Sequence, residues 1–249
     1  RRWIPPAVVF LLVVATWQLV VSWTGISEYL LPSPAAVLQA AFDPSLGWPR
    51  HIGITVGEIA GGFLLAAAAG VLLGVLITWS PLLSDALVPL LVFTNTLPKV
   101  AVAPLFLIWV GYGTLPNILM AGLIAFFPIV INTAVGLSQV DPELLDLARS
   151  LQASRTRIFL KIRLPHAVPY ILGSLKVAVT MAVVGAVIGE FIAAQAGLGY
   201  VITTVQMTLN TRVAFAAIFW ISVVGLALYG LVTAAGRRLA PWAQVPEGP

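Results

Sequence analysis

The sequence predicts an all-α polytopic membrane protein with about six transmembrane helices. Hydrophobic residues make up 60% of the 249 residues and charged residues only 9%, whereas a typical soluble domain holds roughly 45–50% and about 25%. The apolar residues form continuous runs of about 20 residues, which is the length that a helix needs to cross the bilayer core. Because the runs do not alternate with polar residues, they do not fit the strands of a membrane β-barrel.

Each predicted span is an apolar run between polar breaks. The first run follows two arginines, as the apolar core of a secretory signal would. It is longer than such a core, however, and it holds Trp17 and ends at Trp23, which suit an interfacial aromatic belt. We therefore expect a retained span rather than a cleaved signal. The six runs cover residues 7–23, 54–78, 86–110, 115–137, 171–194 and 213–235.

The distribution of basic residues predicts that both termini face the cytoplasm, because cytoplasmic segments near the spans carry the excess of Lys and Arg. With the N-terminus inside, nine basic residues fall in inner segments and two, Arg50 and Arg212, in outer segments. The sequence contains no internal repeat or linker, so residues 1–249 are interpreted as a single transmembrane domain. The nine inner residues are Arg1, Arg2, Arg149, Arg155, Arg157, Lys161, Arg163, Arg237 and Arg238.

The composition excludes several kinds of site. The chain has no cysteine, which excludes disulfides, iron–sulfur clusters and thiolate metal sites, and its 13 basic residues are too sparse to coat a nucleic acid. His51 and His166 lie far apart without carboxylates at ligand spacing, so we expect no metal site. A phosphate-binding loop requires Gly-Lys-Ser or Gly-Lys-Thr, but the lysines follow Pro98, Leu160 and Leu175. We therefore expect no cofactor and no enzymatic activity in this chain.

The largest polar segment, residues 139–168, is predicted to be a cytoplasmic hairpin of two short helices. Asp141 and Pro142 are typical of a helix start, Ser154 is a second start, and Pro165 is expected to end the second helix. Such a segment could lie on anionic lipid or dock a cytoplasmic partner. Its two caps and two apolar faces favour a defined hairpin over a solvated run of charges. The apolar faces comprise Leu144, Leu147, Ala148, Leu151, Ile158, Phe159 and Ile162.

Residues 146–154 read Asp-Leu-Ala-Arg-Ser-Leu-Gln-Ala-Ser, and Phe159 and Leu164-Pro165 follow. This combination resembles the EAA loop of ABC importer permeases. Flanking segments are similar to the nitrate/sulfonate/taurine branch of that family: Pro98-Lys99-Val100-Ala101, Gly189-Glu190-Phe191-Ile192 and Gly197-Leu198-Gly199-Tyr200. The resemblance extends over residues 33–235.

Two positions depart from the family pattern. Family members usually have Gly between the loop helices, where the turn needs a positive φ, but this chain has Gln152. The first acidic residue is Asp146 rather than Glu. Because of these two differences, the family pattern does not define the exact geometry of the loop in this chain.

The resemblance implies a type I ABC importer permease in the bacterial inner (cytoplasmic) membrane, in contact with membrane lipid. It also implies a second permease chain, usually in a homodimer, two cytoplasmic subunits that bind ATP and Mg, and an extracytoplasmic substrate-binding protein. ATP-driven closure of the ATPase pair would move the loop and switch the spans between inward-open and outward-open states. The loop contacts carried over are Asp146, Leu147, Ala148, Arg149, Leu151, Gln152, Ala153 and Arg155.

Lys99 is the candidate for the translocation pathway. It lies about 13 residues, or roughly 20 Å, into the third run, where Pro98 and Pro104 should both interrupt the helix. A charge inside the membrane needs a partner or a water-filled path, and a broken helix is typical of a solute pathway. The alternative is a structural ion pair with Glu58 or Glu190.

Further polar residues are candidates for the pathway or its gate. Thr94, Asn95 and Thr96 precede the break, and each could hydrogen-bond either a polar solute or the backbone of its own helix. Glu190 is expected at an outer gate or in a role that holds the loop at residues 197–200, and the alternative is that its long side chain only reaches the membrane interface. Glu58 also lies near the outer end of its run, and its role is less defined.

The leading hypothesis is the permease subunit of an ATP-driven, binding-protein-dependent importer of a small polar solute. Nitrate, sulfonates such as taurine, bicarbonate, aromatic carboxylates and vitamin precursors all fit, and several of these are anions. The alternative is a self-sufficient secondary transporter or channel, against which the large loop and the missing repeat argue. A membrane-embedded enzyme is disfavoured because no catalytic set clusters in the sequence.

Overall fold

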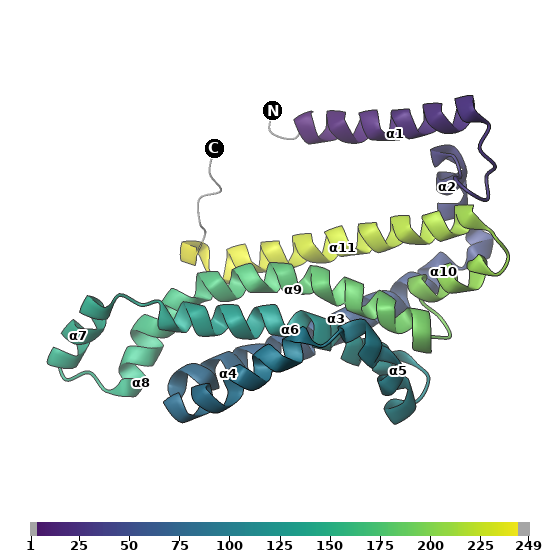
Figure 1. Cartoon of the computed structure of the whole chain (residues 1–249). Coiled ribbons are helices and arrows are strands. Elements are labelled where there is room, and N and C mark those ends of the chain that lie inside the picture. The colour runs from purple at the N-terminus through teal and green to yellow at the C-terminus, as the bar shows by residue number, and fades with distance from the viewer. Residues whose placement is uncertain (1–3, 244–249) are drawn as a thin grey trace.

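The computed structural model describes residues 4–243, and this part of the chain consists of helices and short connections without a strand (Figure 1). Helix α6 packs between α3 and α9, and α11 lies along α9 (Figure 1). The elements are α1 (Ile4–Thr24), α2 (Pro34–Ala41), η1 (Pro44–Leu46), α3 (Trp48–Trp79), α4 (Pro81–Thr96), α5 (Lys99–Val110), α6 (Thr114–Ser138), α7 (Pro142–Ser150), α8 (Arg155–Ile158), the π-helical turn η2 (Phe159–Arg163), α9 (Leu164–Ala193), α10 (Leu198–Gln206), α11 (Thr211–Leu239) and η3 (Pro241–Ala243).

The predicted class, an all-α polytopic membrane protein, is confirmed. By length and composition, four helical stretches can cross a membrane: α3, α6, α11 and the stretch Arg155–Ala193 that contains α9. Helices α4 and α5 add a fifth apolar unit that is bent by 95°. The apolar part of α1, Val8–Thr24, is shorter. Each predicted run therefore coincides with helix, but residues 86–110 do not form one straight span.

The bend between α4 and α5 lies at Pro98, as predicted. A residue that precedes proline avoids helical backbone angles, and Leu97 is extended with φ −64° and ψ 136°. The expectation that Pro104 also breaks the helix is wrong, because Pro104 lies inside α5 and the helix continues to Val110. One missing N–H and some local adjustment are tolerated within an apolar helix, whereas the extended Leu97 ends α4 outright.

Small residues allow the backbones of α3 and α9 to approach the backbone of α6 closely. A Cβ on Gly185 of α9 would lie 2.6 Å from Ala121 Cα in α6, and a Cβ on Gly62 of α3 would collide with the Ala121 side chain. Ala121 and Ala125 are fully buried at these contacts. Close approach of small residues is a main source of helix association in membranes. The three helices therefore form the closely packed centre of the molecule.

Candidate functional site

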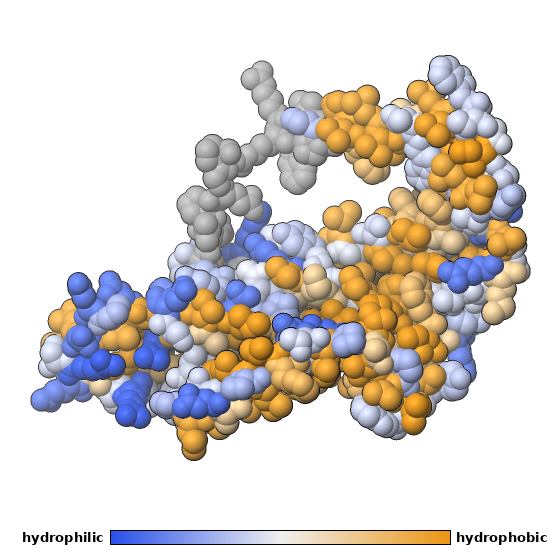
Figure 2. Space-filling model, in the orientation of Figure 1, coloured by the Kyte–Doolittle hydropathy of each residue, from blue (hydrophilic) through white to orange (hydrophobic). Residues whose placement is uncertain are grey.

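The hairpin, which we define as α7, α8 and η2, extends beyond the end of the helical bundle near the last turn of α11 (Figure 1). Charged residues gather over it, whereas apolar residues cover much of the visible surface of α4 and α5 (Figure 2). Asp141 caps α7 by accepting a hydrogen bond from the Glu143 N–H at 2.9 Å, and Ser154 caps α8 by accepting from the Arg157 N–H at 3.3 Å. Both predicted helix starts are confirmed.

The second hairpin helix does not end at Pro165, so that prediction is wrong. Instead α8 continues through η2 into α9, and Pro165 occupies the first turn of α9. In the π-helical turn the Leu164 N–H donates to the carbonyl of Phe159, five residues earlier. This wider turn interrupts the regular α-helical hydrogen-bond ladder just before the proline, which lets the chain stay helical.

Gln152 joins the two hairpin helices in a left-handed conformation, with φ +54°. The Ala153 N–H donates to the Ala148 carbonyl at 3.0 Å and the Gln152 N–H to the Arg149 carbonyl at 2.9 Å. This pair of hydrogen bonds is the Schellman ending of a helix, in which glycine usually occupies the left-handed position. The chain thus keeps the turn that the family pattern requires, but it does so with a residue that carries a Cβ.

The hairpin exposes large apolar side chains. Leu147 is 57% exposed and Leu151 is 74% exposed, whereas Ala148 is buried inside the hairpin. Asp146 and Arg149 form an exposed ion pair, with the Arg149 Nη1 atom 2.7 Å from Asp146 Oδ1. Of the predicted loop contacts, Leu147 and Leu151 therefore offer apolar surface, Asp146 and Arg149 offer a charged edge, and Ala148 supports the loop from inside.

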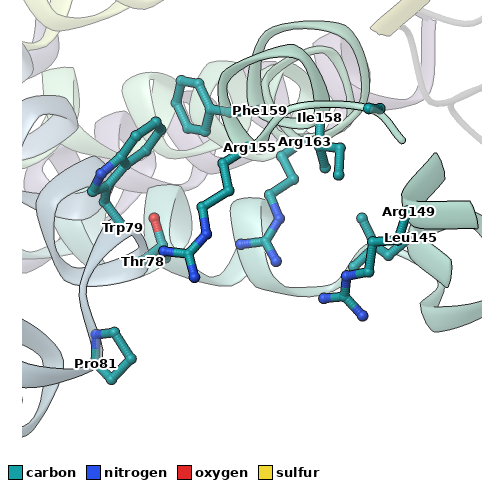
Figure 3. A pocket seen from close by; sticks show the side chains of 10 residues that line it. Thr78, Trp79, Pro81, Leu145, Arg149, Arg155, Ile158, Phe159 and Arg163 are labelled. Atoms are coloured by element: carbon teal, nitrogen blue, oxygen red, sulfur yellow. The ribbon is translucent and has the colours of Figure 1, made fainter. Parts of the chain in front are cut away.

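A pocket of about 510 Å³ separates the hairpin from the turn between α3 and α4 (Figure 3). Three arginines from the hairpin side line it, and Trp79 of α3 contacts Phe159 edge to face, with ring centroids 5.2 Å apart. Ala153 and Arg155, two of the predicted loop contacts, belong to this lining. The complete lining is Thr78, Trp79, Pro81, Leu145, Arg149, Ala153, Arg155, Ile158, Phe159 and Arg163.

Lys99 lies directly at the bend between α4 and α5. Its Nζ atom donates to Asn95 Oδ1 at 2.8 Å and lies 4.7 Å from the centroid of the Phe127 ring in α6, a cation–π contact. Asn95 therefore binds a side chain, whereas Thr94 and Thr96 donate to carbonyls of their own helix. The structure places Asn95, Pro98 and Lys99 together at the bend, with Asn95 bound to Lys99.

Glu58 and Glu190 do not pair with Lys99, so that alternative does not hold in this structure. Both lie inside the bundle, where Glu58 is 2% exposed and Glu190 is 1% exposed. Glu58 Oε1 accepts from the Asn117 Nδ2 amide of α6 at 2.8 Å. The Glu58 Oε2 atom is buried without a hydrogen-bond partner among the described residues.

Glu190 fixes the start of α10 through hydrogen bonds. Its carboxylate accepts hydrogen bonds from the Gly199 N–H and from the Thr55 hydroxyl, the latter at 2.5 Å. Thr55 Oγ1 in turn accepts from the Leu198 N–H at 2.8 Å. Gly197 has a φ of +128°, and a Cβ there would collide with the Glu190 carboxylate. The structure thus shows Glu190 bound to the loop at residues 197–200, whereas a role at a gate stays a prediction.

Sequence reasoning missed the partners of these two carboxyl groups. His51, Thr55 and Glu58 are spaced four and three residues apart, which places them on one face of α3. His51 Nδ1 lies 3.1 Å from both the N–H and the carbonyl oxygen of Gly197, and Asn117 reaches Glu58 from α6. The polar spacing within an otherwise apolar helix was the available signal. It marks a buried polar face that fixes α10 to α3 and α9.

The helical bundle, the capped hairpin and the helix pair bent at Pro98 are features of a multi-pass membrane protein. Residues 51–241 match the family model described as "Binding-protein-dependent transport system inner membrane component". The chain therefore belongs to this family, the inner-membrane permease components of ABC transporters. This confirms the family expected from the loop and its flanking motifs.

Characterised relatives extend over nearly the whole chain. The formylaminopyrimidine transport permease protein of Halalkalibacterium halodurans is 32% identical over 238 residues, which cover 95% of this chain and 95% of the relative. The nitrate import permease protein of Leptolyngbya laminosa is also 32% identical, over 254 residues that cover 97% of this chain and 89% of the relative. Equal identity to permeases named for different solutes shows that overall similarity does not select the solute.

A solved structure shares the fold. The MetNI methionine ABC transporter, captured in inward-facing conformations, contains a chain that matches with a TM-score of 0.61 and 18% sequence identity. The match covers 78% of the present chain and 95% of that chain. The predicted architecture of an ABC importer permease is confirmed by this likeness together with the family match.

Proposed function

We propose that this chain is the transmembrane subunit of a bacterial ATP-driven importer and that the hairpin docks on a separate cytoplasmic ATPase subunit. The observation that carries the proposal is the hairpin itself, which is capped at both helices and extends beyond the bundle. Its exposed leucines leave apolar surface uncovered on the most charged part of the molecule (Figure 2). Apolar residues within a polar rim are typical of a protein interface.

The proposal includes a second copy of the chain around a central pathway. Helix α4 has no buried residue among those described, and α5 has only Ala103. Both expose large apolar side chains, such as Phe93 and Ile108, to lipid or to a partner helix. Asn95 in the last turn of α4 and Lys99 at the start of α5 lie at the bend between these two helices. If this face packs on its counterpart, a cation and an amide line the seam, which would suit a small polar or anionic solute delivered by an extracytoplasmic binding protein.

The first test is purification of the tagged full chain from its native host in mild detergent, followed by mass spectrometry. A soluble ATPase with a phosphate-binding loop is expected in near-equal amount. Leu151→Asp should weaken its retention about 10- to 30-fold, because a charge would replace a leucine at the centre of the interface. Leu239→Asp is the matched control, since Leu239 is also 74% exposed but lies at the end of α11.

A contrary result would replace the proposal. If the chain is recovered alone and still transports solute into vesicles without ATP, it is a self-sufficient secondary transporter or channel. If the ATPase is recovered equally with both variants, the hairpin leucines are not the docking surface.

A further inference from the structure

We propose that the pocket between the hairpin and the α3–α4 turn binds the phosphate group of an anionic phospholipid. Arg155 and Arg163 come from successive turns of α8 and η2, and Arg149 comes from the end of α7 (Figure 3). Their guanidinium groups extend into the same space from two sides of the hairpin (Figure 3). One guanidinium group can donate two parallel hydrogen bonds to the oxygens of a phosphate, so converging arginines are a phosphate-binding arrangement.

The pocket has positive charge without a counter-charge of its own. No Asp or Glu is among its lining residues. Arg149 is paired with Asp146, but within the described residues Arg155 and Arg163 take part in no ion pair. The Thr78 hydroxyl already donates to carbonyls of α3 at 2.9 and 3.1 Å, so it is not a free donor. Converging like charges repel one another, and a bound anion would remove that cost.

The remaining walls of the pocket are apolar and belong to the end of a membrane helix. Trp79 is the last residue of α3, and its ring packs on Phe159, with Ile158 and Pro81 also lining the space. Tryptophan is enriched where membrane helices leave the hydrocarbon. A phospholipid headgroup has a phosphate next to glycerol and acyl carbons, which matches arginines next to Trp79. Basic pockets of this kind between membrane helices bind anionic headgroups.

The pocket shares Arg149, Ala153 and Arg155 with the predicted loop contacts but does not include the exposed leucines. The pocket lies against the α3–α4 turn, where two apolar helices end, whereas Leu147 and Leu151 are exposed and are not part of its lining. A lipid phosphate would therefore connect the hairpin to α3 without occupying its exposed leucines.

The test compares lipid retention by the purified full chain. Native mass spectrometry would measure phosphatidylglycerol and phosphatidylcholine bound to the chain in detergent. The double variant Arg155→Gln with Arg163→Gln should weaken phosphatidylglycerol retention about 30-fold. The matched control is Arg157→Gln with Lys161→Gln, which removes two exposed charges from the same segment outside this pocket. Retention by the control should change less than about threefold, and phosphatidylcholine should bind weakly to all forms.

Three results would overturn the proposal. Equal losses in the two double variants would mean diffuse attraction of lipid to a basic surface. Inorganic phosphate that displaces phosphatidylglycerol at equal concentration would mean a site for a soluble anion. A photoreactive residue in place of Trp79 that crosslinks to the ATPase, and not to lipid, would mean that an acidic protein segment fills the pocket. The comparison requires that both double variants keep the helical content of the original chain. If the glutamine variant is unfolded, Arg155→Lys with Arg163→Lys replaces it and tests charge alone.

Discussion

Replacing Gln152 with glycine should stiffen the hairpin. Gln152 adopts φ +54° at the Schellman ending of α7, a conformation that glycine reaches without steric cost. For a residue with a Cβ, the left-handed conformation costs roughly 1–2 kcal/mol. Glycine also raises the conformational entropy of the opened chain, which offsets roughly 0.4–1 kcal/mol of that gain. The closed hairpin should therefore gain about 0.5–1 kcal/mol, which lowers the open population about two- to fivefold.

Hydrogen exchange in detergent measures this change directly. The amide of Ala153 donates to the Ala148 carbonyl across the turn, so it exchanges only when the turn opens. Its exchange in Gln152→Gly should slow by about two- to fivefold relative to the original chain. Gln152→Ala is the matched control, because alanine keeps the Cβ and the steric cost. Equal rates in the glycine and alanine variants, or faster exchange with glycine, would refute the reasoning.

Three further predictions follow from the membrane part of the chain. Lys99→Met should lower uptake at least tenfold without loss of assembly, because it removes the cation at the helix bend, and normal uptake of an identified solute would exclude a pathway role. Glu190→Leu should lower the unfolding free energy by about 2–5 kcal/mol, because it leaves the Gly199 N–H and the Thr55 hydroxyl without an acceptor; thermal unfolding checks this, and Glu190→Gln should lose less. Gly62→Ala should cost about 1–3 kcal/mol by forcing α3 away from α6, whereas Gly57→Ala, with nothing within 4 Å of the new Cβ, should be nearly neutral in the same assay.

Local signals in the sequence predicted most of the helices and the hairpin. The apolar runs located the long helices, and Asp141 and Ser154 marked the N-caps of α7 and α8, which begin at Pro142 and Arg155. These features depend on neighbouring residues only, through hydrogen-bond capping and continuous apolar composition. The helix break at Pro98 could likewise be predicted from the sequence, because proline restricts the residue directly before it.

The features that could not be predicted depend on contacts between distant segments. Glu58 and Glu190 are 132 positions apart by their numbers, and only the packing of α3 against α9 brings them together. The arginine pocket likewise needs the end of α3 beside the hairpin. Pro104 and Pro165 do not end their helices as proline usually does, because an apolar helix tolerates Pro104 by local adjustment and a π-helical turn precedes Pro165. The roles of Asn95, Lys99 and the loop residues in transport stay predictions.

The close contact of α3, α6 and α9 limits how an alternating-access cycle can proceed. Ala121 is held from both sides, by Gly62 and by Gly185, with no room for another methyl group. Helices that interlock in this way cannot slide past one another without separating first. In the proposed importer cycle, the three helices would therefore turn together as one unit, moved from the hairpin end. Shape change within the subunit is then left to its loosely held parts, chiefly α4 and α5 on either side of the Pro98 hinge.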